Sequence, residues 1–456
     1  MSETSSDTNY TNKRLKTSSS ETTRHDDDED QNWVNNLPEP FVRFLRENDI
    51  SIEIYQTHEN LPRYARIVQY HPDHYTKEYA QKIVKGLRDQ MKCGVELVQS
   101  FPSFLKLDHN CGPLSQSQVY LDCNVLGMSL SSAIPVYALD IQPNDHILDL
   151  CSAPGTKMLL MCESLIKAWR EQSPLPYKEP KSHLDCADEY GNGTVTAVEI
   201  EKHRAESCRS RIKKANFVVS SRVRLYNTDG TRFNVPPPNK DWWDVKAMRR
   251  WKEEGRELSK DKDTKRLPGS KAINSFVKST NISQLPWYSP KPLRSEFSLG
   301  NNGLYDKVIV DAECTHDASL PHIKKYKDWG WDKLATQVVN PDRIKEICNL
   351  QIRLLENGWR LLAPGGIIVY STCTFAAAQN EQIVWWFLKR HPKEAVLEPI
   401  PCVENIPYMM PKLPPGIDPD DASGVLGKLK HCVRLDPRVS DTKGMFVARI
   451  RKVSTD

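Results

Sequence analysis

Two cysteines each follow an apolar segment that has the pattern of a buried β-strand. Residues 307–311, which end in Asp311, precede Cys314, and residues 366–371 precede Cys373. If both strands belong to one parallel sheet, their carboxyl ends meet at one edge, and we expect the two thiols to lie near each other. A positioned thiol is a potential nucleophile, so the pair indicates covalent catalysis. The alternative for either cysteine alone is a small, buried, unreactive side chain.

A turn of small residues follows a further apolar segment, residues 146–150, and opens a predicted helix. The turn reads Cys151-Ser152-Ala153-Pro154-Gly155-Thr156-Lys157. Backbone N–H groups at a helix N-terminus favour an anion. The turn matches neither a GxGxxG fingerprint nor a GxxxxGK[ST] phosphate loop, which weakens dinucleotide and ATP interpretations. A carboxylate, such as that of S-adenosylmethionine, is a candidate ligand.

Two acidic residues stand at the ends of the next two predicted strands. Glu199 ends the segment 194–200, and Asp229 follows the segment 223–226. A carboxylate at such a strand end can accept hydrogen bonds from ribose hydroxyls, and Asp229 could accept from an adenine amino group. The alternatives are a solvated glutamate and a simple Asp-Gly turn.

Strands and helices alternate from residue 145 onward, which indicates a parallel α/β sheet. The predicted strands are 146–150, 194–200, 223–226, 307–311, 366–371 and 445–450, and the predicted helices are 155–166, 202–215, 341–362 and 381–389. We assign residues 121–456 to this catalytic domain. Local patterns predict helices at 40–48 and 77–91 and strands at 64–68 and within 95–107, so residues 33–120 form a small α+β domain. A further helix is predicted at 124–138, just before the alternating strands and helices begin.

Charge is distributed unevenly along the 456 residues. Residues 1–32 carry eight acidic and four basic side chains, and we expect a disordered acidic tail there. Residues 233–300 carry fourteen basic and eight acidic side chains and four of the eleven tryptophans. Basic residues interleaved with aromatic ones suit single-stranded nucleic acid. The alternative is that the tryptophans anchor this insertion onto the domain.

Several classes of protein are excluded by composition. The chain has no run of about 18 apolar residues, so we expect no membrane span. The N-terminus is polar and unlike a signal peptide, which predicts an intracellular protein of the nucleus or cytoplasm. Twelve cysteines without an export signal predict reduced thiols. No CxxC pair or compact Cys/His cluster is visible, so we expect no metal, and nothing indicates a state other than a monomer.

The ordered set DLCSAPGTK, AVEI, NTDGT, VDAEC and YSTCT resembles the Sun/Nop-type family of RNA cytosine-C5 methyltransferases. The likeness runs from about residue 62 to residue 448 and omits the tail and the insertions. It implies a Rossmann-like class I methyltransferase fold with a small N-terminal RNA-binding domain. It also implies that S-adenosylmethionine is the cofactor and that RNA is the partner, with transfer RNA expected before ribosomal RNA.

The resemblance also implies a role for each site residue. Cys373 would add to cytosine C6, which makes C5 able to take the methyl group and form 5-methylcytosine. Asp311 would hydrogen-bond the base near N3, supply a proton and lie close to the cofactor. Cys314 would assist loss of the C5 proton and release of the enzyme, and Lys157 would lower a thiol pKa or orient Asp311. The cofactor would lie along residues 151–157, with Glu199 at its ribose and Asp229 near its adenine.

Two positions depart from the family pattern. Thr156 replaces a second glycine, which is tolerable if its φ is negative. Glu313 replaces a proline before Cys314, and its carboxylate would disfavour a thiolate there. Two alternatives therefore stay open: a catalytically weak or inactive RNA-binding scaffold, and a DNA cytosine methyltransferase, whose usual nucleophile stands where Cys314 does.

Overall fold

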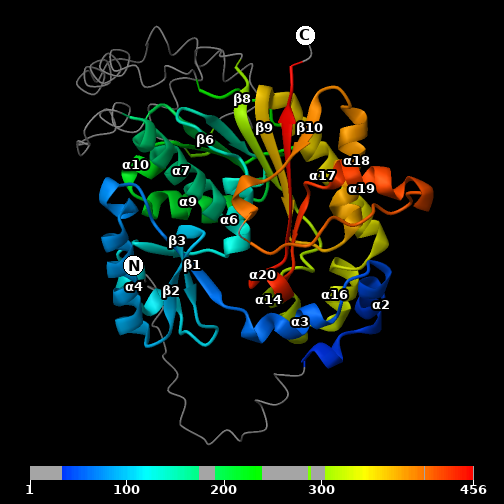
Figure 1. Ribbon diagram of the computed structural model, residues 1–456, viewed down its shortest axis with the longest axis horizontal. Helices are drawn as coiled ribbons and strands as arrows, with labels where there is room; N and C mark the ends of the chain where they lie inside the picture. The colour runs from blue at the N-terminus through cyan, green and yellow to red at the C-terminus, as the bar shows by residue number, and fades with distance from the viewer. Residues whose placement is uncertain (1–32, 174–190, 239–285, 289–302, 405, 455–456) are drawn as a thin grey trace, which may run out of the picture.

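The computed structural model describes residues 33–173, 191–238, 286–288, 303–404 and 406–454. The predicted acidic tail and most of the predicted basic insertion lie outside these residues. A large sheet has the strand order β10-β12-β9-β8-β5-β6-β7, with β11 paired to β12 (Figure 1). Its strands are β5 (His146–Asp149), β6 (Thr194–Val198), β7 (Val223–Tyr226), β8 (Tyr305–Asp311), β9 (Leu362–Thr372), β10 (Ala395–Glu398), β11 (Val433–Leu435) and β12 (Met445–Lys452).

Every strand predicted for the catalytic domain is present in this sheet. The five strands β5 to β9 are mutually parallel. The prediction of a wholly parallel sheet is wrong at one edge, where β12 runs antiparallel between β9 and β10. The apolar pattern of β12 shows that both its faces are covered, but it carries no information on strand direction.

Helices cover both faces of the large sheet (Figure 1). Ile147 and Ile309 pack with residues of α7, α9 and α10, whereas Leu148 and Val308 pack with residues of α17, α18 and α19. Neighbouring residues of one strand thus face different helical layers, which explains the continuous apolar runs in these strands. These helices are α7 (Thr156–Gln172), α9 (Lys202–Lys214), α10 (Phe217–Ser220), α17 (Pro341–Leu361), α18 (Glu381–Arg390) and α19 (Ala422–Leu429).

A second, antiparallel sheet has the order β2-β3-β1-β4 and packs against α4 (Lys77–Met91). Its strands are β1 (Arg63–Ile67), β2 (Val95–Val98), β3 (Phe101–Leu107) and β4 (Val125–Gly127). The helix predicted over 124–138 is wrong in its first part, because β4 pairs with β1 and the helix observed there, α6 (Leu130–Tyr137), begins only at Leu130. Pairing with a strand about 60 residues away overrides the local apolar pattern.

The first described helices pack on the catalytic domain. They are η1 (Trp33–Asn36), α2 (Glu39–Glu47) and α3 (Glu53–Gln56). Phe41 and Tyr55 share a buried apolar cluster with Leu320, Leu334 and Phe375. These partners come from α14 (Leu320–Lys324), α16 (Trp331–Gln337) and the segment after β9. The packing places residues 33–56 beside the large sheet, while the division at residue 120 stays a prediction.

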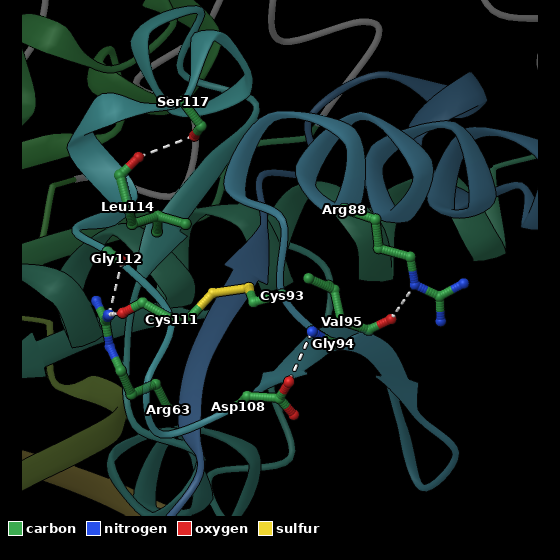
Figure 2. The surroundings of a disulfide bond; sticks show 10 residues. All are labelled: Arg63, Arg88, Cys93, Gly94, Val95, Asp108, Cys111, Gly112, Leu114 and Ser117. Carbon is green, nitrogen blue, oxygen red and sulfur yellow. Dashed lines mark hydrogen bonds between the residues drawn. A yellow bond between two sulfur atoms is a disulfide. The ribbon is translucent and has the colours of Figure 1, made fainter.

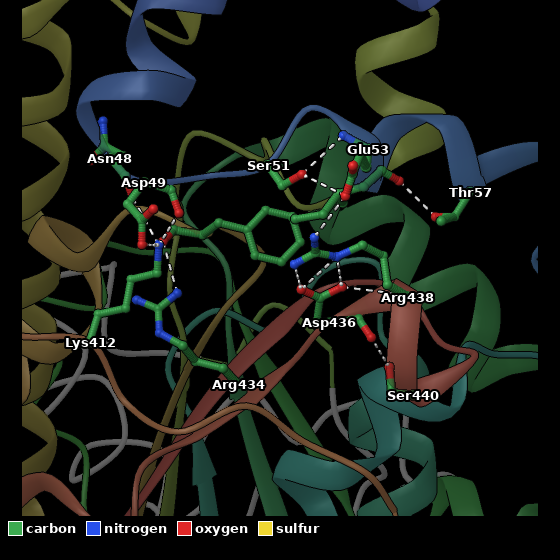
Figure 3. Close-up of polar contacts among 12 residues, drawn as sticks. Asn48, Asp49, Ser51, Glu53, Thr57, Lys412, Arg434, Asp436, Arg438 and Ser440 are labelled. Atoms are coloured by element: carbon green, nitrogen blue, oxygen red, sulfur yellow. Dashed lines mark hydrogen bonds and ion pairs between the residues drawn. The ribbon is translucent and has the colours of Figure 1, made fainter.

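Polar contacts also join this helical segment to the C-terminal part of the chain (Figure 3). Lys412 Nζ donates to the Asn48 carbonyl at 3.0 Å and lies 3.2 Å from Asp49 Oδ2. Arg438 reaches Glu53 Oε2 at 3.4 Å. Such exposed ion pairs contribute at most about 1 kcal/mol each, so the apolar cluster dominates this interface.

One disulfide contradicts the prediction that all cysteines are reduced. Cys93 and Cys111 are bonded, and their Cα atoms lie 5.6 Å apart (Figure 2). The antiparallel β2–β3 hairpin brings together one residue shortly before β2 and one shortly after β3, at a Cα separation typical of disulfides. Their 18-residue separation in sequence gives no sign of this proximity. The other cysteines that the structure describes are free thiols.

Among the residues that the structure describes, none of the helices has the length and apolar character needed to cross a membrane.

A buried ion pair links the small sheet to the catalytic domain. Arg66 Nη1 lies 2.5 Å from Glu163 Oε2 of α7, and the two side chains are 1% and 5% exposed. The Gln69 N–H donates to the same oxygen at 2.9 Å. We expect Glu163→Gln to lower the free energy of unfolding by about 3 kcal/mol, because it leaves the guanidinium buried without its counter-charge. Urea denaturation of the full chain measures this loss.

The same helix supplies a matched control. Glu171 pairs with Lys167 at 3.5 Å, but both side chains are more than half exposed. Glu171→Gln should change the free energy of unfolding by less than about 0.5 kcal/mol. Equal losses in the two variants would contradict a special contribution from the buried pair.

Candidate active site

The candidate site lies where the order of the large sheet reverses. From β5 the chain moves outward to β6 and β7, and from β8 it moves the other way to β9, so β5 and β8 flank the switch point. Ligands of open α/β sheets bind beyond the carboxyl ends of the strands at this place. A cavity of about 660 Å³ lies here, and its lining includes Cys151, Ala153, Pro154, Thr156, Lys157, Glu199, Asp229, Asp311, Glu313, His316 and Cys373.

The turn between β5 and α7 forms one wall of this cavity. Gly155 has a φ of +95°, and a Cβ there would lie 3.3 Å from the Cα of Cys208, so both conformation and space favour glycine. Thr156 is the first residue of α7 and has no positive φ, which meets the condition set for a non-glycine residue. Ser152 and Gly155 lie behind the wall, and the Ser152 N–H donates to the Val198 carbonyl at 3.0 Å.

Glu199 and Asp229 both line the cavity, and both are held by local contacts. The Glu199 carboxylate accepts the N–H groups of Ala153 at 3.3 Å and of Glu201 at 3.0 Å. Asp229 Oδ1 accepts the N–H and the hydroxyl of Thr231, each at 2.8 Å. The predicted Asp-Gly turn therefore exists, and it presents Asp229 to the cavity. Their contacts with ribose and adenine stay predictions.

Lys157 and Asp311 form an ion pair in the cavity wall. Lys157 Nζ lies 2.7 Å from Asp311 Oδ2, and the Ser371 hydroxyl donates to Asp311 Oδ1 at 2.7 Å. Burial is the largest single effect and lowers the pKa of Lys157, but the charge and hydrogen bond of Asp311, with the charges of Cys373 and Asp149, together raise it. Beneath the pair, burial first and the Asp311 charge second raise the pKa of Asp149 to about 7. This ion pair is the contact that the expected role of Lys157 in orienting Asp311 requires, and that role stays a prediction.

The structure brings the two cysteines together at the sheet edge. Cys314 Sγ lies 3.3 Å from Cys373 Sγ. The hydrogen bond from Cys314, followed by the positive charge of His316, lowers the pKa of Cys373 well below its usual range. Burial and the contact with Cys373 raise the pKa of Cys314. Close thiols cannot both ionise easily, and the two pKa directions favour a thiolate at Cys373 and a protonated thiol at Cys314.

His316 completes this group and was missed in the sequence. Its Nδ1 lies 2.8 Å from Cys373 Sγ and 3.7 Å from Cys314 Sγ. The ligand-type atoms of these three residues all lie within 4.8 Å of one another, so the fold forms a compact Cys/His cluster that was not visible in the sequence. The expectation that the chain binds no metal stays a prediction. The only sequence signal was the Cys-x-His spacing of 314 and 316, because His316 and Cys373 stand 57 residues apart.

Comparison with known proteins agrees with this geometry. A family model described as 16S rRNA methyltransferase RsmB/F matches residues 256–451, which include Asp311, Cys314 and Cys373. The tRNA (cytosine(34)-C(5))-methyltransferase of Drosophila melanogaster is 23% identical over 355 residues, 70% of this chain and 36% of that protein. The likeness to the RsmB/F methyltransferases is thus established for residues 256–451.

Other relatives cover less of the chain. The ribosomal RNA small subunit methyltransferase F of Cronobacter sakazakii is 30% identical over 151 residues, 33% of this chain. The match spans only 26% of the length of that protein. Among solved structures, NSun6 from Pyrococcus horikoshii with SFG has a TM-score of 0.55 at 13% identity and covers 92% of this chain and 99% of that one. A methyltransferase homolog from the same organism has a TM-score of 0.52 at 21% identity, covering 88% and 89%. The predicted Rossmann-like methyltransferase fold is thereby confirmed.

A buried aspartate connects the two loops that carry the thiols. The Asp317 carboxylate accepts the hydroxyls of Thr315 and Thr374 and the N–H of Phe375 at 2.8 Å. The Tyr55 hydroxyl donates to the Asp317 carbonyl at 3.0 Å. Asp317 thus joins the loop that carries Cys314 to the loop that carries Cys373, and it ties both to α3. A buried carboxylate with several donors fixes such loops firmly.

Glu313 is turned toward a partner that compensates its charge. Its carboxylate pairs with the Arg343 guanidinium of α17, and its carbonyl accepts from Gln351 Nε2 at 2.9 Å. The opposite charge of Arg343 offsets the field that the carboxylate exerts on neighbouring groups. Glu313 therefore disfavours a thiolate at Cys314 less than an unpaired carboxylate at this position would.

Proposed function

We propose that this chain transfers a methyl group from S-adenosylmethionine to C5 of cytosine in RNA, forming 5-methylcytosine through a covalent Cys373 adduct at C6. The observation that carries the proposal is one cavity lined by Cys373, Asp311 and the turn after β5. The cavity holds a paired carboxylate and a lowered-pKa thiol at the strand ends where α/β enzymes bind ligands. Two relatives named as RNA methyltransferases support the same reaction class.

The lining residues fit S-adenosylmethionine. The cavity volume of about 660 Å³ is in the usual range for ligand sites. We assign the cofactor to residues 151–157, with its carboxylate toward the N-terminus of α7, Glu199 at the ribose and Asp229 near the adenine. When bound, the cofactor supplies an electrophilic methyl group. The solved structure of NSun6 with SFG supports this assignment by fold.

The paired thiols divide the chemistry between them. Cys373, which is held as a thiolate, adds to C6 of the cytosine and breaks the C5–C6 double bond. Asp311, oriented by Lys157 and Ser371, hydrogen-bonds the base near N3. After C5 has gained the methyl group, Cys314 accepts the C5 proton and the Cys373–C6 bond breaks, which restores the double bond. The base must be unstacked to reach Cys373.

The sign of the two thiol pKa shifts suits this order of events. Cys314 stays protonated while Cys373 is a thiolate, because burial first and the contact with Cys373 second raise the pKa of Cys314. Once Cys373 is bonded to C6 it carries no negative charge, and this contribution is lost. Cys314 then loses its proton to solvent more easily, and the resulting thiolate can accept the C5 proton at the stage where a base is needed.

Transfer RNA is the substrate class that we place first. The Drosophila relative named for tRNA aligns with 70% of this chain, whereas the bacterial relatives named for ribosomal RNA align with about a third. Ribosomal RNA stays second, and the active form is proposed to be a monomer. The scaffold alternative rested on Glu313, whose pairing with Arg343 weakens it.

The test is incubation of the purified chain with methyl-labelled S-adenosylmethionine and total cellular RNA, with DNA in a parallel reaction, followed by nucleoside analysis. Label in 5-methylcytidine from RNA supports the proposal. Label in deoxycytidine would favour the DNA alternative. Absence of label, with measurable cofactor binding, would favour the scaffold alternative.

A further inference from the structure

We propose that His316 is a positioning residue that takes the proton of the Cys373 thiol and holds the sulfur as a thiolate at the edge of the cavity. This inference deepens the proposed function, because it says how the attacking sulfur is prepared. In the step, the S–H bond of Cys373 breaks and an N–H bond forms at Nδ1 of His316. The products are a thiolate and an imidazolium, so no other reactant is needed.

The distances from the His316 ring to the two sulfur atoms support a His316–Cys373 pair. His316 Nδ1 lies 2.8 Å from Cys373 Sγ, closer than it lies to Cys314 Sγ at 3.7 Å. His316 and Cys373 both line the cavity, while Cys314 is 3% exposed and lies behind it. The imidazole therefore contacts the sulfur that can meet a substrate. A cysteine paired with a histidine in this way is the usual form of an activated thiol.

The backbone of the loop places His316 for this contact. His316 has a φ of +57°, in the left-handed region that non-glycine residues seldom occupy. The Ser319 N–H donates to the His316 carbonyl at 2.9 Å, and the Ala318 N–H donates to the Cys373 carbonyl at 3.1 Å. These bonds, with the Asp317 network, hold the two loops together and support the unusual conformation. Such conformations gather at functional sites, where surrounding contacts maintain them.

Charged and titratable groups from five parts of the chain face the pair. Asp311 of β8 raises the pKa of both members, and Glu313 adds to that of His316. Lys157 of α7 and Lys443 before β12 bring positive charge toward Cys373. The His322 ring of α14 lies 5.4 Å from the His316 ring, and burial, followed by the charge of His316, lowers its pKa.

The directions of the two pKa shifts define a pH range in which His316 is protonated while Cys373 is ionised. The charge of Cys373 is the largest cause that raises the pKa of His316, to about 9. The pKa of Cys373 is lowered well below its usual range. The imidazolium is present below about pH 9 and the thiolate is present above the lowered pKa of Cys373, so the pair exists between the two values.

The test is the pH dependence of Cys373 alkylation by iodoacetamide in the full chain. Mass spectrometry of the peptide that contains Cys373 separates its rate from those of the other thiols, and prior EDTA treatment removes adventitious metal. The wild-type midpoint should lie well below the ordinary cysteine value of about 8.5. The midpoint is the quantity to compare, because the plateau rate falls as a thiol pKa falls. A wild-type midpoint near the ordinary value would overturn the proposal without any variant.

The diagnostic variant is His316→Asn, and its matched control is His322→Asn. His316→Asn should raise the alkylation midpoint by at least about one pH unit and slow alkylation at pH 6 about tenfold. His322→Asn removes a neighbouring ring that interacts with Cys373 electrostatically but has no hydrogen bond to it among the described residues, and it should shift the midpoint much less. Equal shifts in the two variants would mean a general field effect and would also overturn the proposal.

A second measurement covers the case in which His316→Asn does not fold. The thiolate absorbance near 240 nm of the wild-type protein should titrate with the low midpoint, and Cys373→Ser should remove that transition. Persistence of the transition in Cys373→Ser would assign it to another thiol and reject the pair. Neither measurement requires RNA or cofactor. A chain that alkylates as expected but transfers no methyl group would therefore refute the proposed function and leave the His316 assignment intact.

Discussion

Replacing Cys373 with alanine is expected to abolish methyl transfer while S-adenosylmethionine binding is retained. The proposed reaction begins when the sulfur of Cys373 bonds to C6 of the cytosine. Cys151 is the other cysteine on the cavity lining, but it belongs to the proposed cofactor turn and is not placed to replace Cys373. Loss of a covalent nucleophile lowers turnover by about a thousandfold or more. The measurement is label incorporated into 5-methylcytidine, with cofactor affinity followed by calorimetry.

A cysteine outside the cavity supplies the control for this variant. Cys123 is an exposed, free thiol in the turn before β4, and Cys123→Ala should retain wild-type turnover. Cys373→Ala should also bind the cofactor as tightly as wild type does. Cys373 follows β9, which is separated by β8 from β5 and the proposed cofactor turn. Normal turnover in Cys373→Ala would reject the nucleophile assignment, and loss of cofactor binding would indicate a misfolded site.

The sequence was most informative at positions where a reactive side chain comes directly after a buried strand. The apolar segments before Asp149, Asp311 and Cys373 could be recognised as strands from short-range patterns alone. Parallel strands then require their carboxyl ends to share an edge, so the meeting of Asp311, Lys157 and the two thiols could be expected from the order of strands along the chain. The observed distances of 2.7 Å and 3.3 Å agree with that expectation.

Contacts that depend on loop conformation could not be predicted in this way. His316 reaches Cys373 only because its backbone adopts a positive φ, and no local pattern specifies that conformation for histidine. The partner of Glu313 comes from α17, 30 residues further along the chain. A charge in a motif can be read from sequence, but the side chain that compensates it depends on tertiary packing.

Packing between distant segments limited the fold prediction as well. Strands β4 and β10 are short, and the local pattern is weak for each. Each forms because a longer neighbour, β1 or β12, offers an unpaired edge. The amphipathic pattern of α2 correctly predicted a helix but could not show that its apolar face meets α16.

The second large effect is expected at Cys314, where removal of the thiol should trap the enzyme on its RNA. The Cys373–C6 bond can break only after C5 loses its proton, and Cys314 is the proposed acceptor. Cys314→Ser keeps a hydroxyl that can donate to Cys373, whose sulfur lies 3.3 Å from the Cys314 sulfur in the wild type. The serine hydroxyl is too weak an acid to ionise, so it cannot accept the C5 proton. Cys314→Ser should therefore form the adduct and fail to release it.

The comparison of two substitutions separates the roles of Cys314. Cys314→Ala loses both the base and the hydrogen bond that is the largest cause of the low pKa of Cys373, so it should form the adduct more slowly than Cys314→Ser does. A protein–RNA species stable in denaturing gels is the readout, and adding Cys373→Ala to either variant should remove it. Continued turnover without an adduct in both variants would show that another group accepts the C5 proton. The neutral form of His316 would then be the first candidate, because bonding of Cys373 to C6 removes the charge that most raises the pKa of His316.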